Sequence, residues 1–359
     1  MMDDRWGGRE PVRCEAGHAP PNSGRDGRLD GMRRPFAVLA AALLVGAFAV
    51  PASAADGDDG FTIKDPRITE SSGLAASRQH PGIYWTHNDS DDGAYLYAVD
   101  SATGETVATV TLTGVGTPRD VEAISVGPDN ELWVGDIGDN LGGTWPHVWI
   151  YRLPEPKELR DRTVRATQYV VQYQGGARDA ESLVVHPKTG RVYIADKKEE
   201  GGQLFEGPAE LSASGTNVFK PVARIDNLQA TDATLSPDGR KLVVRSYFGA
   251  FAYDWNSGDI KKTGRLSVPF LGQGESVTYT ADGGRLMYGA EGAESSVEPE
   301  DAPDSGGSSG SDSSSGEGSS AAGDGGSGGG DGNVRTGALA VAAVLAALFG
   351  VSRLRRRSR

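Results

Sequence analysis

The chain of 359 residues contains a single cysteine, Cys14, close to its N-terminus. A disulfide framework is therefore excluded, and packing alone must stabilise any folded domain. Between residues 58 and 300 the chain also lacks a Gly-x-Ser-x-Gly elbow, a His-Glu-x-x-His pair, a phosphate-binding loop and a dinucleotide fingerprint. We accordingly expect no nucleotide cofactor.

Basic residues are scarce in the central part of the chain. Residues 56–333 hold 43 of the 49 acidic residues but only 23 of the 36 basic ones, so the net charge of −13 is unevenly distributed. An acidic body repels phosphate backbones and attracts cations. No nucleic-acid partner is expected, whereas a cation or a basic partner is compatible with this charge.

The N-terminal segment has the features of a targeting signal. Residues 1–31 are polar and precede Met32, so we interpret them as an extension of the gene model. Arg33 and Arg34 are followed by an uncharged apolar run, residues 36–50, and then by small residues up to Ala55. This order is typical of a secretory signal peptide, which we assign to residues 32–55.

The C-terminal segment predicts a membrane anchor. Residues 301–335 are almost entirely Gly, Ser, Asp, Glu and Ala, which predicts a disordered linker. Residues 336–352 are apolar and predict a transmembrane helix, and residues 353–359 form a basic tail that is expected on the cytoplasmic side. The folded domain would then face outward from the cell membrane. Release of the domain after C-terminal processing is the alternative.

Five copies of one pattern occupy the middle of the chain. Each has a first strand, a turn rich in Pro, Asp and Gly, and a second strand that ends in polar residues, as in residues 122–136. The steps between equivalent positions are 50, 59, 50 and 44 residues, close to the length of a four-stranded propeller blade. The equivalent residues, each acidic or hydroxylated, are Ser72, Glu122, Glu181, Thr231 and Glu275.

These repeats predict an all-β fold, a β-propeller over residues 58–300. Five blades are our first expectation. Six blades are the alternative, and they would require additional strands between residues 138 and 173. The fifth copy lacks an obvious outer strand, and residues 61–64 form a spare strand ahead of the first copy. We therefore expect this N-terminal strand to complete the last blade.

A propeller brings the equivalent residues together, because the first strand of every blade lines the central axis. Converging carboxylates repel one another, which raises their pKa values unless a cation binds. Oxygen ligands favour Ca²⁺, or Mg²⁺, over zinc. The alternative is that the Asp and Asn side chains cap tight turns. The predicted metal ligands are Asn88, Asp89, Glu122, Asp136, Asp139, Glu181, Asp196 and Glu275.

Fewer residues suit acid–base chemistry or anion binding. His87 is the histidine expected at the channel mouth, and together with Glu122 and Asp136 it forms the candidate catalytic set. Lys197 and Arg245 are placed to meet an anionic ligand group at the same rim, with ion pairs to neighbouring carboxylates as the alternative.

Four segments resemble those of a group of secreted bacterial propeller proteins known as WD40-like or phytase-like. They are residues 72–75, 86–90, 120–123 and 135–140, and the resemblance spans residues 70–295. Propeller phytases hold calcium through clustered acidic residues, and lactonase-type propellers hold one divalent metal on the axis. The resemblance therefore implies calcium ligands at positions such as Glu122, Asp136 and Glu181.

Two functions are compatible with these features. The first is an exported, membrane-tethered binding module whose extracellular ligand or protein partner the sequence does not identify. The alternative is a calcium-dependent hydrolase that acts on phosphoesters or, less in keeping with the pattern, on lactones. A propeller fold hosts both functions, so the fold does not decide between them.

Overall fold

A computed structural model describes residues 59–90 and 92–303. The expected leader, signal peptide, transmembrane helix and basic tail, and all but the start of the expected linker, lie outside these residues. The described part of the chain is all-β, and its helical content is one short 3-10 turn, η1 (Pro128–Asn130). Among the described residues, no helix is long and apolar enough to cross a membrane.

The strands form five groups of four, each built from antiparallel neighbours. Group 1 contains β2 (Ser71–Ala76), β3 (Ile83–Asn88), β4 (Tyr95–Asp100) and β5 (Thr106–Thr113). Group 2 contains β6 (Val121–Val126), β7 (Glu131–Asp136), β8 (Val148–Pro154) and β10 (Thr167–Tyr173). Group 3 contains β11 (Ala180–Val185), β12 (Val192–Asp196), β13 (Gly202–Glu206) and β14 (Thr216–Ile225). Group 4 contains β15 (Asp232–Leu235), β16 (Lys241–Ser246), β17 (Gly249–Asn256) and β18 (Asp259–Leu266).

Group 5 joins the two ends of the folded domain. It contains β19 (Gly274–Tyr279), β20 (Arg285–Ala290), β21 (Ser296–Asp301) and the short N-terminal strand β1 (Phe61–Thr62). Phe61 pairs with Val297 in an antiparallel register, so the edge of β21 is covered. This pairing confirms the prediction that the spare N-terminal strand completes the last group.

The long segment between β7 and β10 contributes one strand outside the groups of four. This strand, β9 (Arg162–Arg165), pairs in parallel with β5 and widens group 1 at its outer edge. β10 in turn pairs in parallel with β14, which joins groups 2 and 3 into one sheet. The extra strand is thus added to an existing group.

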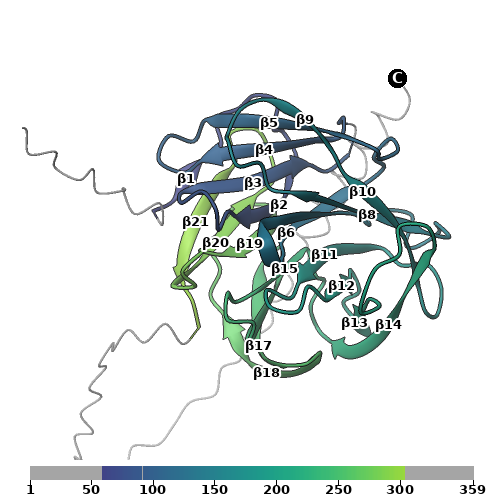
Figure 1. The fold of residues 1–359 in the computed structure, drawn as a ribbon. Helices are drawn as coiled ribbons and strands as arrows, with labels where there is room; N and C mark the ends of the chain where they lie inside the picture. Colours follow the sequence, from purple (N-terminus) through teal and green to yellow (C-terminus); the bar gives the residue numbers. More distant parts are fainter. Residues whose placement is uncertain (1–58, 91, 304–359) are drawn as a thin grey trace, which may run out of the picture. The chain divides into compact units, whose positions relative to one another are not determined.

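The first strands of the groups, β2, β6, β11, β15 and β19, contact one another in a closed cycle, and we call them the inner strands. They are labelled near the middle of Figure 1, with β5, β9, β14 and β18 farther out. Groups of strands arranged in a cycle about a common centre give a β-propeller-like fold, as the repeats predict.

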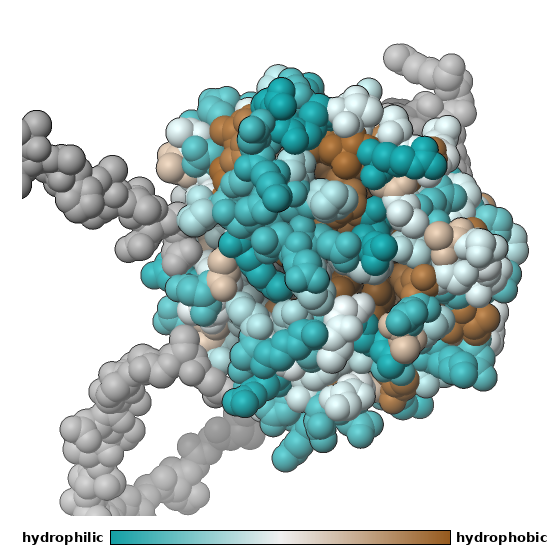
Figure 2. Space-filling model, viewed as in Figure 1, coloured by the Kyte–Doolittle hydropathy of each residue, from teal (hydrophilic) through white to brown (hydrophobic). Residues whose placement is uncertain are grey.

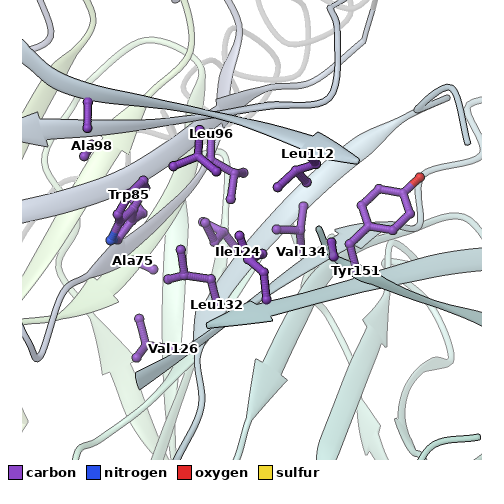
Figure 3. Close-up of a cluster of buried hydrophobic side chains, with 14 of the residues drawn as sticks. Ala75, Trp85, Leu96, Ala98, Leu112, Ile124, Val126, Leu132, Val134 and Tyr151 are labelled. Carbon is purple, nitrogen blue, oxygen red and sulfur yellow. The ribbon is translucent and has the colours of Figure 1, made fainter. Parts of the chain in front are cut away.

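Hydrophobic packing follows the same cycle. Five buried clusters lie between neighbouring groups, and the cluster that includes Ile63, Leu74 and Met287 joins group 5 to group 1. Figure 3 shows the cluster between groups 1 and 2, where Trp85 and Leu96 face Ile124 and Leu132. Trp85 and Trp133 pack in successive clusters.

One glycine allows β1 to lie against group 1. Gly104 has a positive φ of 75°, and a methyl group there would overlap the carbonyl oxygen of Thr62 in β1. We expect Gly104→Ala to lower the free energy of unfolding, measured by urea denaturation, by about 2–4 kcal/mol. Gly82 has a similar φ of 77°, but its nearest neighbour is the Ser101 hydroxyl at 3.5 Å. Gly82→Ala should therefore cost only about 1 kcal/mol, and equal losses for the two variants would contradict the overlap.

Candidate functional site

The repeated glutamates lie at irregularities in the inner strands. The register with the second strand shifts at Glu122, at Glu181 and at Glu275, and group 1 shows a similar shift next to Ser72. A β-bulge leaves its extra residue outside the ladder and re-aims its side chain. Each glutamate is therefore held by a regular strand while its carboxylate is directed away from the strand pairing.

These glutamates share one electrostatic environment. Burial, followed by the charges of Asp89, Glu181 and Asp120, raises the pKa of Glu122 well above its usual value. Burial also raises the pKa of Glu181, and nearby Glu275 adds to this increase. The charges of these residues act on one another in sequence, Glu181 on the pKa of Glu122 and Glu275 on the pKa of Glu181.

Lys197 lies among these carboxylates and forms an ion pair with Glu181. Burial alone would lower the pKa of Lys197, but Glu181, Tyr247, Glu122 and Glu275 raise it above its ordinary value. The ammonium group is thus held charged by the acidic cluster. Of the two alternatives for Lys197, an anionic ligand or an ion pair with a neighbouring carboxylate, the structure shows the ion pair.

The tightest grouping of carboxylates joins groups 1 and 2. Asp89, Asp120 and Glu122 are all buried, and one ligand oxygen from each lies within 4.8 Å of the others. We call these three residues the acidic triad. Ser72 Oγ donates to Glu122 Oε2 at 2.9 Å, and Asn140 Nδ2 donates to Asp120 Oδ2 at 2.8 Å. Three oxygen ligands at this spacing suit a hard divalent cation.

Glu181 supplies an observation that is independent of the triad. The residue is 4% exposed, and its second carboxylate oxygen, Oε2, is buried without a hydrogen-bond partner among the described residues. The same carboxylate is close enough to Glu122 to raise the pKa of that residue. A buried carboxylate oxygen that lacks a donor is costly unless a cation or a water completes its contacts.

Asp136 and Asp139 hold backbone instead of joining the triad. Asp136 accepts from the backbone N–H groups of Arg119 and Asp120 and from the Tyr151 hydroxyl. Asp139 accepts from the backbone of Thr144 and Trp145 and so closes its own loop. The contacts of Asp139 therefore agree with the alternative to metal binding, in which Asp side chains cap tight turns. Asp136 acts on the triad indirectly, because it fixes the backbone of Asp120.

Asn88 and Asp196 also lie outside the triad. The Asn88 side chain accepts from the N–H groups of Thr69 and Glu70 and donates to Arg67 O and to Asp92. Asp196 accepts from Gln203 N at 2.7 Å, and burial raises its pKa. Both side chains therefore have structural partners of their own.

His87 is buried, with 1% of its surface exposed. Burial lowers its pKa to about 4, so the ring is neutral at pH 7. Nδ1 lies 3.0 Å from Asn88 O, and Nε2 packs against Gly73. An acid–base catalyst must reach its substrate, and a ring with 1% of its surface exposed offers little contact area for one.

Arg245 was expected at the rim, but the structure buries it completely. Its Nη1 donates to the backbone carbonyls of Ser276 and Gly289, so the side chain joins group 4 to group 5. Burial lowers its pKa to about 10, which leaves the guanidinium charged at pH 7. In sequence, Arg245 occupies the same strand-end position as polar residues of the other copies. Its long side chain, however, extends from group 4 to group 5.

Two residues of the site have weaker sequence signals. Asp120 is two positions ahead of the repeated Glu122 and has no equivalent carboxylate in every copy, so repeat comparison alone does not select it. Gly138 lies directly over the triad, and a methyl group there would be 2.6 Å from Glu122 Oε1 and 2.7 Å from Asp120 Oδ2. A glycine in the loop after a strand is the signal that could have indicated this close approach.

Comparisons with known proteins give no family. No protein-family model and no curated protein matches the chain. Similar solved structures include a protein provisionally described as a 6-phosphogluconolactonase from Bacteroides uniformis, with 13% identity, a TM-score of 0.39 and coverage of 66% of this chain and 69% of that chain. A chain of a nidogen/laminin complex shows 16% identity, a TM-score of 0.39 and coverage of 61% and 72%.

A chain of the mitotic checkpoint complex is 14% identical, with a TM-score of 0.35 and coverage of 64% of this chain. The present chain spans 61% of the length of that chain. Similarity at this level is too low to indicate which ligand the present chain binds or which activity it has.

Proposed function

We propose that this protein is a five-bladed β-propeller that serves as a binding module and holds one divalent cation, calcium in preference to magnesium, at one mouth of its axis. Its five groups of strands are the blades. The observation that carries the proposal is the acidic triad, whose three buried ligand oxygens lie within 4.8 Å of one another. Glu181, with a buried oxygen lacking a donor, supports a cation at this mouth.

In this proposal the cation links two blades. Asp89 follows the second strand of group 1, whereas Asp120 and Glu122 belong to the start of group 2. A cation bound by all three would neutralise like charges and fix the loop of residues 137–147, which contacts Asp120 through Asn140. The chemistry supplied is electrostatic: the bound ion would offer its remaining positions to an oxygen-bearing ligand.

The binding role is preferred to hydrolysis because the candidate acid–base residue is inaccessible. Cleavage of a phosphoester or a lactone needs a group that delivers or removes a proton at the reacting atoms. His87 is buried and neutral, and Lys197 is engaged with Glu181. The phytase-like alternative predicts turnover of a generic phosphate ester, lost in Glu122→Gln protein. We expect no such turnover by the wild-type protein.

The proposal includes export by residues 32–55 and anchoring by residues 336–352, so that the propeller faces the exterior. Calcium sites of extracellular modules are often weak, with Kd values of about 0.1–1 mM. Protease added to intact cells should release the propeller if this orientation is right. Protection of the domain until the cells are lysed would contradict it.

The cation itself is tested by thermal unfolding in calcium and in EGTA. At a calcium concentration of about ten times Kd, binding stabilises the folded state by about 1.4 kcal/mol. For a domain of this size we expect the Tm to rise by about 3–6 °C. Glu122→Gln should abolish this rise, whereas Glu298→Gln, a substitution in β21, should leave it intact. An unchanged wild-type Tm in calcium would overturn the proposal.

Without calcium, Glu122→Gln should stabilise the protein at alkaline pH. The folded-state pKa of Glu122 is raised, so the stabilising contribution of its proton is fully present below the unfolded-state value of about 4.3. That contribution is lost as the pH rises through the folded-state pKa. In EGTA the variant should therefore melt above the wild type at pH 8, and the difference should shrink toward pH 4. In calcium the order of the two Tm values should reverse.

A further inference from the structure

A cleft that contains no residue of the acidic triad lies at the outer edge of group 1. It has a volume of about 540 Å³ and is lined by residues of β4, β5 and β9 together with Arg67 and Asp92. Figure 1 shows these three strands side by side. The volume falls within the range typical of small-molecule sites.

Strand register builds a flat platform in this cleft. Tyr95 of β4 pairs with Thr111 of β5, and Thr111 pairs with Thr163 of β9, so these side chains form one cross-strand row. In the next row Tyr97 pairs with Thr109, whose N–H donates to Asp161 Oδ1 at 2.8 Å. Alternate residues of a strand share a face. One face therefore carries a tyrosine and then threonine side chains in each row, and of the two tyrosines Tyr95 is exposed whereas Tyr97 is buried.

Two arginines and two aspartates border the platform, so their formal charges cancel. Arg67 lies over the Tyr97 ring at 5.1 Å and is paired with Asp65. Arg162 Nε and Nη2 are buried and form no hydrogen bond among the described residues, and Nη2 forms an ion pair with Glu158 Oε2 at 3.6 Å. Planar guanidinium and carboxylate groups can each contact two neighbouring hydroxyls at once. The cleft thus offers both hydrogen-bond donors and hydrogen-bond acceptors.

We propose that this cleft binds a neutral saccharide. The exposed face of Tyr95, 38% accessible, would pack against the apolar face of a sugar ring, and the threonine, arginine and aspartate side chains would bond its hydroxyls. Asp92 and Asp161 offset the charges of Arg67 and Arg162, so the lining gives a phosphate or another anion no net attraction. The polar walls disfavour an apolar ligand, since unpaired polar groups would be buried beneath it.

The proposal is tested on the full chain by calorimetric titration and saturation-transfer NMR. The probes are glucose, galactose, mannose, N-acetylglucosamine, maltose, cellobiose and chitobiose, with glucuronate and glucosamine as charged counterparts. We expect saturable binding of at least one neutral sugar. Tyr95→Ala and Thr111→Val should each weaken it about tenfold, because one removes the ring and the other a hydroxyl at constant shape.

Matched controls separate this site from general damage and from the cation site. Phe248→Ala removes another exposed aromatic ring and Thr216→Val removes a hydroxyl on β14, and both should bind as the wild type does. Glu122→Gln should also leave sugar binding unchanged, so failure of the calcium proposal would not affect this one. Three results would overturn it: no saturable binding by any neutral sugar at about 10 mM, tighter binding of glucuronate, or unchanged affinity in both Tyr95→Ala and Thr111→Val proteins.

Discussion

Replacing Arg245 with methionine should lower the free energy of unfolding by about 3–5 kcal/mol. The substitution removes the guanidinium that donates to two buried carbonyl oxygens, those of Ser276 and Gly289. It also removes the positive charge near buried Asp232 and Glu275, whose charges act on the guanidinium. Methionine fills similar volume, so lost polar contacts should dominate over the cavity.

Urea denaturation monitored by tryptophan fluorescence measures this loss. Arg240→Met is the matched control, because the Arg240 side chain is 79% exposed and its contact with Asp238 is a surface ion pair of 3.8 Å. Such a pair contributes at most about 1 kcal/mol. If both variants lost less than this amount, Arg245 would not be joining groups 4 and 5.

The second large effect concerns cation binding. Gly138→Ala should abolish the calcium-dependent rise in Tm, with an affinity loss of about 100-fold or more. The new methyl group would be 2.6 Å from Glu122 Oε1 and 2.7 Å from Asp120 Oδ2, so both carboxylates would have to move apart from their present positions. A hard cation depends on the spacing of its oxygen ligands.

Gly264→Ala in β18 is the control for this substitution, because a methyl group there meets no atom within 4 Å. It should retain the full calcium response. Circular dichroism would establish that Gly138→Ala protein is folded before calcium is added. A folded Gly138→Ala protein with a wild-type calcium response would show that the ion, if bound, lies elsewhere.

Most of the fold could be predicted from the sequence, because each repeat carries a local pattern. Alternating apolar residues and Pro/Asp/Gly turns identified the first two strands of every group. Strands with weaker patterns were missed, such as β18, whose exposed residues include Lys261 and Lys262, and β21, which contains Pro299. These outer strands are determined by their neighbours in the sheet more than by their own composition.

The acidic cluster was predictable in outline but not in its contacts. Repetition identified Glu122, Glu181 and Glu275, because equivalent positions of a repeat occupy equivalent places in space. It could not distinguish Asp89, which joins the triad, from Asp139, which caps its own loop. Asp and Asn have the same affinity for turns whether or not a ligand is present, so the distinction depends on backbone geometry.

The clasp between β1 and β21 sets the order in which this domain can assemble. Phe61 and Thr62 pair with Val297 and Ser296, and Ile63 N–H donates to Ser295 O at 2.9 Å, so the two ends of the folded domain are joined here. Joining such distant segments costs more chain entropy than forming any hairpin, and slow folding accompanies long-range pairing. The cycle of groups should therefore close last, and the pairing of β1 with β21 should be the first to open under tension or during proteolysis.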